Sequence, residues 1–155
     1  MHVAFRDILF EPKPVQRPGP PIWVGGEGTA AQKRAGELGD GWYPTIRNPK
    51  EPLDDPKRLA ASLAGVHRFA AAVGRDPAGI DVAIFAPGYA LGAPAKSRDG
   101  GRMTFTGSAE EIAADARAYR EAGVRHINIG FESTDLDDVL RKLDAFVKQV
   151  VPRVG

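Results

Sequence analysis

The chain contains no cysteine and only three histidines (His2, His67 and His126) among its 155 residues. Without cysteine there are no disulfides, no thiolate chemistry and no cysteine-ligated zinc, and the scattered histidines form no metal-binding motif. Lys plus Arg number 21 against 20 Asp plus Glu, so no basic excess favours nucleic acid. Because there is neither a signal-peptide pattern nor an apolar run of about 18 residues, we expect a cytoplasmic protein that binds neither nucleic acid nor membrane.

Proline is concentrated at one end of the chain. Residues 11–21 include five prolines, which lack the amide donor that helices and central strands require. We therefore expect residues 1–21 to form an extended, proline-rich lead-in and residues 22–155 to form a single α/β domain. A complete eight-unit β/α barrel needs about 200–250 residues, so this chain is too short for one.

Short β-favouring runs alternate with helical segments along residues 22–155. The expected strands are 22–24, 42–43, 80–85 and 124–131, and the expected helices are 29–38, 56–73, 109–122 and 136–150. Four consecutive βα units of this kind predict a parallel sheet with helices packed on it. Residues 86–106 carry several glycines and no clear period, which is typical of a long loop that acts as a lid or binding segment.

The segment VGGEGTAA (24–31) is the strongest candidate for a binding site. A buried strand ends, glycines allow a close backbone approach, and a helix begins with unpaired amides at its positive end. This pattern is typical of a phosphate-binding turn, although glycine-rich turns without a ligand also occur in α/β proteins. The same turn also matches the dinucleotide fingerprint G-x-G-x-x-A, at Gly26, Gly28 and Ala31. In that motif a carboxylate after the next strand holds the ribose of NAD, and no carboxylate is found there. Arg47 in that segment leaves NADP as the one dinucleotide to consider.

Other polar residues allow weaker functional hypotheses. Four carboxylates follow the last strand and could bind a metal, but charges and caps at a helix start explain them better: Glu132, Asp135, Asp137 and Asp138. Arg98 and Arg102 in the long loop could hold an anionic substrate or cofactor tail, or could simply be solvated. Asn128 could touch a cofactor ring or be a satisfied interior residue.

The aromatic residues on the strands and one helical face have a simpler interpretation. Trp23, Trp42 and Phe85 are expected in the core, because large aromatic side chains on buried strands usually pack there. The final helix carries an apolar face that should pack on the sheet, made of Leu136, Val139, Leu140, Leu143, Phe146, Val147 and Val150.

Two long segments carry a more specific resemblance. PKPVQRPGPPIWVGGEGTAAQKRAGELGDGWYP (12–44) and TGSAEEIAADARAYREAGVRHINIGF (106–131) resemble the luciferase-like monooxygenase family, which includes flavin- and F420-dependent oxidoreductases. The resemblance implies the C-terminal half of a TIM-type β/α barrel that binds FMN or F420 at the carboxyl ends of its strands. The residues it assigns to the cofactor phosphate are Gly26, Glu27, Gly28, Thr29, Ala30 and Ala31.

The resemblance also bears on the substrate and on catalysis. It places Thr45 in the substrate pocket, while Asn48 stands where sugar-phosphate dehydrogenases of the family carry a lysine, which argues against a sugar phosphate. The first half of the family's fold, with most of its acid–base residues, has no counterpart here, so no catalytic residue is predicted. The expected function is part of an F420- or FMN-dependent oxidoreductase or monooxygenase acting on a small molecule.

Two alternatives stay open from the sequence. One is a truncated remnant without activity that only dimerises or binds a phosphate ligand, and the other is an NADP-binding Rossmann-type unit. A half barrel exposes two unpaired strand edges, so we expect either self-association or a separate first half to cover them.

Overall fold

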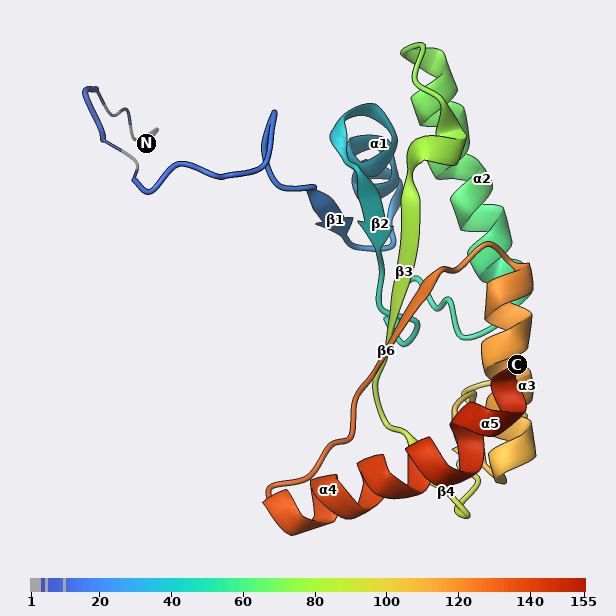
Figure 1. The fold of residues 1–155 in the computed structure, drawn as a ribbon. Helices are drawn as coiled ribbons and strands as arrows, with labels where there is room; N and C mark the ends of the chain where they lie inside the picture. The colour runs from blue at the N-terminus through green and yellow to red at the C-terminus, as the bar shows by residue number, and fades with distance from the viewer. Residues whose placement is uncertain (1–3, 5, 10) are drawn as a thin grey trace.

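The structure is a computed structural model in which residues 4, 6–9 and 11–155 are described (Figure 1). Residues 1–3, 5 and 10 of the expected lead-in lie outside this description. The described residues ahead of Trp23 contain no helix or strand and trail away from the body of the molecule. Among the described residues, no helix combines the length and apolar character that crossing a bilayer requires.

Four parallel strands form the sheet, in the order β1-β2-β3-β6. They are β1 (Trp23–Gly25), β2 (Gly41–Tyr43), β3 (Asp81–Ala86) and β6 (His126–Ile129). The helices that follow them are α1 (Thr29–Leu38), α2 (Pro56–Ala72), α3 (Ala109–Glu121) and α4 (Leu136–Ala145). The shorter elements are η1 (Pro77–Gly79), β4 (Ala90–Leu91), β5 (Thr106–Gly107), the π-helical turn η2 (Phe146–Val150) and α5 (Val151–Val154). The prediction of four βα units on a parallel sheet is confirmed.

Local sequence explains where the helices begin. Asp55 accepts a hydrogen bond from the Lys57 amide at the start of α2, and Pro56 occupies the first helical position. Ser108 and Glu111 form the reciprocal capping box expected at the start of α3. These caps satisfy amides that would otherwise have no partner, so each helix starts at a defined residue.

The core lies between one face of the sheet and helices α2 and α3. Trp42, Val82 and Ile84 point to this side and are buried. Opposite them, the stacked rings of Phe105 and Tyr119 are fully buried, and the Tyr119 hydroxyl donates to the Leu53 carbonyl at 2.8 Å. Burial raises the pKa of Tyr119 well above its usual value.

The other face of the sheet is open. Trp23 is 39% exposed, and its ring centroid lies 5.3 Å from that of His126. Trp23 leans across the sheet over Gly41, where a Cβ would lie 2.6 Å from Trp23 Cδ1. The placement of Trp23 in the core was therefore wrong, whereas that of Trp42 is confirmed. A three-residue strand cannot indicate which of its faces a helix will cover.

The expected packing of the final helix is only partly correct. In α4, Leu136 is 70% exposed, and Leu140 and Leu143 are exposed as well. The apolar stripe reaches the core only beyond α4, where Phe146 packs against it and Val150 is buried. The pattern indicates an amphipathic helix, but most of the stripe is exposed among the described residues, and α4 projects away from the sheet at the edge of the molecule (Figure 1).

Residues 86–106 are more ordered than a plain loop. Strands β4 and β5 pair in parallel, and Arg102 forms a two-pronged ion pair with Asp115 of α3, at 2.6 and 2.9 Å. Asp115 also accepts from the amide of Phe105, which has a positive φ of 60°. Arg102 is thus committed to holding this segment and is not free to hold a ligand.

Candidate functional site

The turn between β1 and α1 has a backbone that only glycine adopts easily at its first position. Gly26 has a φ of 108°, and a Cβ there would lie 2.9 Å from the Cβ of Ala31. Its carbonyl accepts a hydrogen bond from Trp42 Nε1 at 2.8 Å. The glycine is therefore needed for the close fit of the turn against the helix, whether or not a ligand binds.

The start of α1 offers free amides. Gly28 is the N-cap, with extended φ and ψ of −71° and 163°, and makes no side-chain cap. The amides of Ala31 and Gln32 donate to the Gly28 carbonyl. The amides of Thr29 and Ala30, both exposed residues, have no acceptor within the described part of the chain. Two donors thus point outward at the positive end of a helix, the arrangement that binds anions.

Glu27 is part of the same turn but faces the protein. Its side chain belongs to a residue only 6% exposed, and its carboxylate accepts from the Thr45 amide at 2.7 Å and from Asn48 Nδ2 at 2.5 Å. The carboxylate joins the β1–α1 turn to the segment after β2. The sequence analysis placed Glu27 among the residues that hold the cofactor phosphate and did not predict these contacts. They depend on β2 lying beside β1, which only the fold shows.

Thr45 lies where β2 ends. Its amide is held by Glu27, and its hydroxyl donates to the Phe85 carbonyl at 3.4 Å. Thr45 is half-buried and also forms an isolated bridge with Phe85. Its position at the carboxyl edge of the parallel sheet is where α/β proteins bind ligands.

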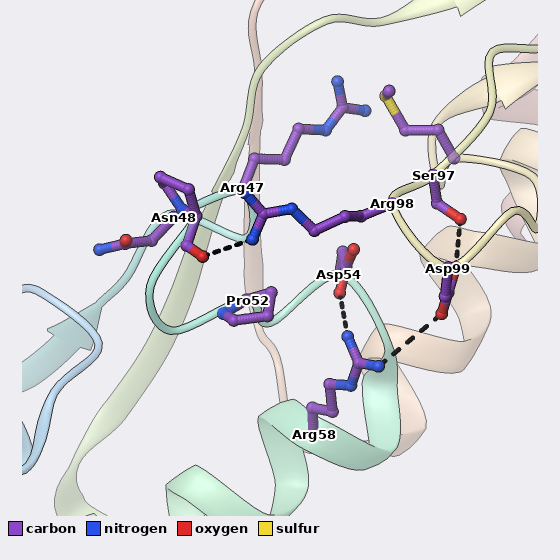
Figure 2. A pocket seen from close by; sticks show the side chains of 10 residues that line it. Arg47, Asn48, Pro52, Asp54, Arg58, Ser97, Arg98 and Asp99 are labelled. Atoms are coloured by element: carbon purple, nitrogen blue, oxygen red, sulfur yellow. Dashed lines mark hydrogen bonds and ion pairs between the residues drawn. The ribbon is translucent and has the colours of Figure 1, made fainter.

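A cavity of about 500 Å³ lies next to this edge (Figure 2). It opens between the segment after β2 and residues 97–103, two segments distant in sequence. Its lining residues are Arg47, Asn48, Pro49, Pro52, Asp54, Arg58, Ser97, Arg98, Asp99 and Met103. The sequence showed only that arginines occur in both loops, and nothing in it indicated that the loops meet.

Three arginines dominate the charge of the cavity. Arg58 pairs with Asp54 at 2.9 Å and with Asp99 at 3.7 Å. Arg47 donates instead to the Thr104 carbonyl at 2.8 Å, and Arg98 donates to the Pro49 carbonyl at 2.6 Å. Burial lowers the pKa of Arg47 below its usual value, while the charge of Glu132 opposes that shift.

The remaining candidates have structural partners. Asp135 accepts from the Asp137 amide at the start of α4, and Asp138 pairs with Lys142 at 2.7 Å. Within residues 4, 6–9 and 11–155, no three metal-binding side chains come together. Asn128 donates to the Tyr43 hydroxyl at 2.7 Å on the open sheet face.

Comparisons with known proteins place the fold. The sequence pattern of the luciferase-like monooxygenase family matches residues 1–99. An FMNH(2)-dependent dimethylsulfone monooxygenase from Pseudomonas putida is 40% identical over 37% of this chain and 17% of its own length.

Solved structures agree with the family match. An F420-dependent secondary alcohol dehydrogenase has a TM-score of 0.63 and 20% identity, over 87% of this chain and 49% of its own. The F420-dependent tetrahydromethanopterin reductase of Methanopyrus kandleri has a TM-score of 0.62 and 14% identity, over 87% and 51%. Monooxygenase RslO1 of Streptomyces bottropensis has a TM-score of 0.61 and 18% identity, over 98% of this chain and 57% of its own.

This chain thus spans about half the length of the TIM-barrel enzymes that it resembles in structure. The predicted half of a TIM-type β/α barrel is confirmed by that match together with the parallel sheet. With most of its length matched by the family pattern, the chain belongs to the luciferase-like monooxygenase family.

Proposed function

We propose that this chain contributes the phosphate-binding turn of an FMN- or F420-dependent oxidoreductase. The observation that carries the proposal is the pair of free amides on Thr29 and Ala30, at the positive end of α1. The small side chains around them, at Gly28, Ala30 and Ala31, leave the backbone accessible to a phosphate. The family includes proteins named for FMNH2 and for F420, so either cofactor is compatible with the turn.

The bound flavin or deazaflavin would supply hydride or electron transfer, and this chain would position it. Thr29 and Ala30 would hold the phosphate, and Glu27 keeps the turn attached to the end of β2 through Thr45 and Asn48. Thr45, at that same edge, is our candidate for contact with a small-molecule substrate.

Proline at position 29 provides a selective test. Thr29 is the first residue of α1, where proline is well tolerated, and the extended Gly28 before it is compatible with a following proline. Thr29→Pro therefore removes one amide donor and leaves the helix intact. Leu136→Pro is the matched control, because it makes the same change at the first position of α4 after an extended Asp135.

Binding of FMN, F420 and riboflavin would be followed by fluorescence and by amide signals in NMR spectra. We expect FMN to bind more tightly than riboflavin, which lacks the phosphate, and Thr29→Pro to weaken FMN binding about tenfold or more, since a hydrogen bond to a charged group contributes roughly 1.5–3 kcal/mol. Glu51→Gln should strengthen binding, because Glu51 Oε1 lies 3.9 Å from where a Cβ on Gly28 would be.

Equal affinities for FMN and riboflavin, or unchanged binding by Thr29→Pro, would refute the role of the turn. Absence of any cofactor binding would favour the inactive remnant, and binding of NADP alone would favour the dinucleotide-binding alternative.

We also propose a partner for the open face of the sheet: further βα units of the kind that the structural relatives carry outside the matched half. The support is the exposed Trp23 and the unpaired edges of β1 and β6, at the two ends of the strand order. Light scattering and acrylamide quenching of Trp23 test this. A monomer with an accessible Trp23 is expected, and a stable dimer that shields it would show self-association instead.

A further inference from the structure

We propose that the cavity lined by Arg47 and Arg98 binds the oxyanion group of a ligand, a carboxylate, sulfonate or phosphate. The inference deepens the proposed function, because it gives the chemical class of a group held beside the cofactor turn. It is tested below by variants that leave that turn unchanged.

The first support is an excess of positive charge. The two aspartates of the lining, Asp54 and Asp99, both pair with Arg58. Arg47 and Arg98 have only backbone carbonyls as acceptors, and no carboxylate lies at ion-pairing distance from either within the described residues. A carbonyl leaves the charge of a guanidinium uncompensated, and several of its N–H donors remain available.

The second support is the burial of Arg47. Its guanidinium is held in a half-buried position, and its Nε atom is buried without a hydrogen-bond partner. Gly88, with a φ of 72°, makes room for it, because a Cβ at that position would overlap Arg47 Nη1. No carboxylate of the described residues contacts this guanidinium, and Glu132 acts on it only from beyond ion-pairing distance. A charge kept away from water without a partner in contact is costly, and a bound anion would offset that cost.

The third support is the position of Arg98. Its exposed side chain crosses the cavity from residues 97–99 to the Pro49 carbonyl on the opposite wall (Figure 2). A long, flexible side chain resting on a neutral acceptor can turn to a bound oxyanion, and the planar guanidinium matches such a group with two parallel hydrogen bonds. A volume of about 500 Å³ suits a small organic anion.

The cavity is joined to the cofactor turn through one side chain. Asn48 lines the cavity and donates to the carboxylate of Glu27, which lies between Gly26 and Gly28. A ligand in the cavity would therefore be linked to the proposed cofactor turn through Asn48 and Glu27. Its oxyanion group would belong either to the substrate or to an anionic part of the cofactor itself.

Titration of the full chain with methanesulfonate and with inorganic phosphate, at constant ionic strength, tests the site. Arg47→Gln and Arg98→Gln should each lower the affinity about tenfold or more. Arg68→Gln, at an exposed position on α2, is the control for the same change of net charge. NMR signals of the Arg47 and Arg98 side chains should shift during the titration. Affinities equal to that of Arg68→Gln for both variants would overturn the proposal.

Two further comparisons complete the test. If Arg47→Gln does not fold, as judged by circular dichroism, the exposed Arg98→Gln decides alone, and wild-type affinity there overturns the proposal. Weaker FMN or F420 binding in Arg98→Gln would identify the cofactor as the source of the anion, whereas unchanged cofactor binding with weaker methanesulfonate binding would identify the substrate. Because Thr29→Pro changes the turn and leaves the cavity intact, whereas Arg98→Gln does the reverse, either site can fail while the other stands.

Discussion

Glu27→Gln should destabilise the protein more than an ordinary surface substitution. In the native structure the carboxylate accepts one hydrogen bond from the Thr45 amide and one from Asn48 Nδ2, at 2.7 and 2.5 Å. Glutamine has a single acceptor oxygen, so it can keep only one of the two, and its NH2 group then faces another donor. Asn48 cannot relieve the conflict by turning over, because its Oδ1 atom accepts from the Lys50 amide at 2.9 Å.

The magnitude follows from that loss. One hydrogen bond to a charged group contributes about 1.5–3 kcal/mol, and water does not readily replace the lost bond because residue 27 is only 6% exposed and both donor residues, Thr45 and Asn48, are half-buried. We expect the free energy of unfolding, measured by urea titration, to fall by about 1.5–3 kcal/mol. A double-mutant cycle with Asn48→Ala should give a coupling energy of at least about 0.5 kcal/mol.

Glu110→Gln is the matched control. Glu110 pairs with Arg117 at 2.7 Å, but its side chain is 64% exposed, so the same substitution should cost less than about 1 kcal/mol. If Glu27→Gln cost no more than Glu110→Gln, the assignment of Glu27 as the connection between the turn and the end of β2 would be wrong.

Three further outcomes are expected. Gly26→Ala should lower stability by about 1–3 kcal/mol in urea titrations, because alanine is strained at a φ of 108° and would press against Ala31; an unchanged midpoint would contradict this. Asp115→Asn should cost about 2–4 kcal/mol and speed hydrogen exchange in residues 97–106, since it removes the more buried of the two carboxylates that pair with Arg102 and leaves only Glu111, at 3.5 Å, and wild-type exchange would count against it. Burial raises the pKa of Tyr119, so the folded state favours its neutral form, and the resulting stability should be lost as the pH rises above about 10, where the unfolded tyrosine ionises. Tyr119→Phe should remove that part of the alkaline loss, as measured by urea titration from neutral to alkaline pH, and an identical pH profile would refute it.

The local elements of this protein could be predicted from the sequence. The capping box at Ser108 and Glu111 and the proline at the start of α2 were read correctly, because caps depend on residues within one helical turn of each other. The four βα units followed from the same local patterns. The glycine-rich turn was also found in this way, although the binding of a ligand there stays a prediction.

The tertiary structure alone decided what the side chains contact. Glu27 faces Thr45 and Asn48, and Arg102 faces Asp115, in pairs that the chain brings together only after it folds. The cavity is the clearest case, because the Arg98 guanidinium meets a carbonyl almost fifty residues earlier in the chain.

The physical reason is the range of the interactions. Helix caps, turns and the alternation of strands and helices are set by neighbours in sequence, so the sequence by itself determined the element order and the family pattern. Which sheet face is covered, as at Trp23, and which loops meet at the carboxyl edge depend on packing between distant segments. Only the folded chain settles those contacts, and they are the ones that shape the candidate site.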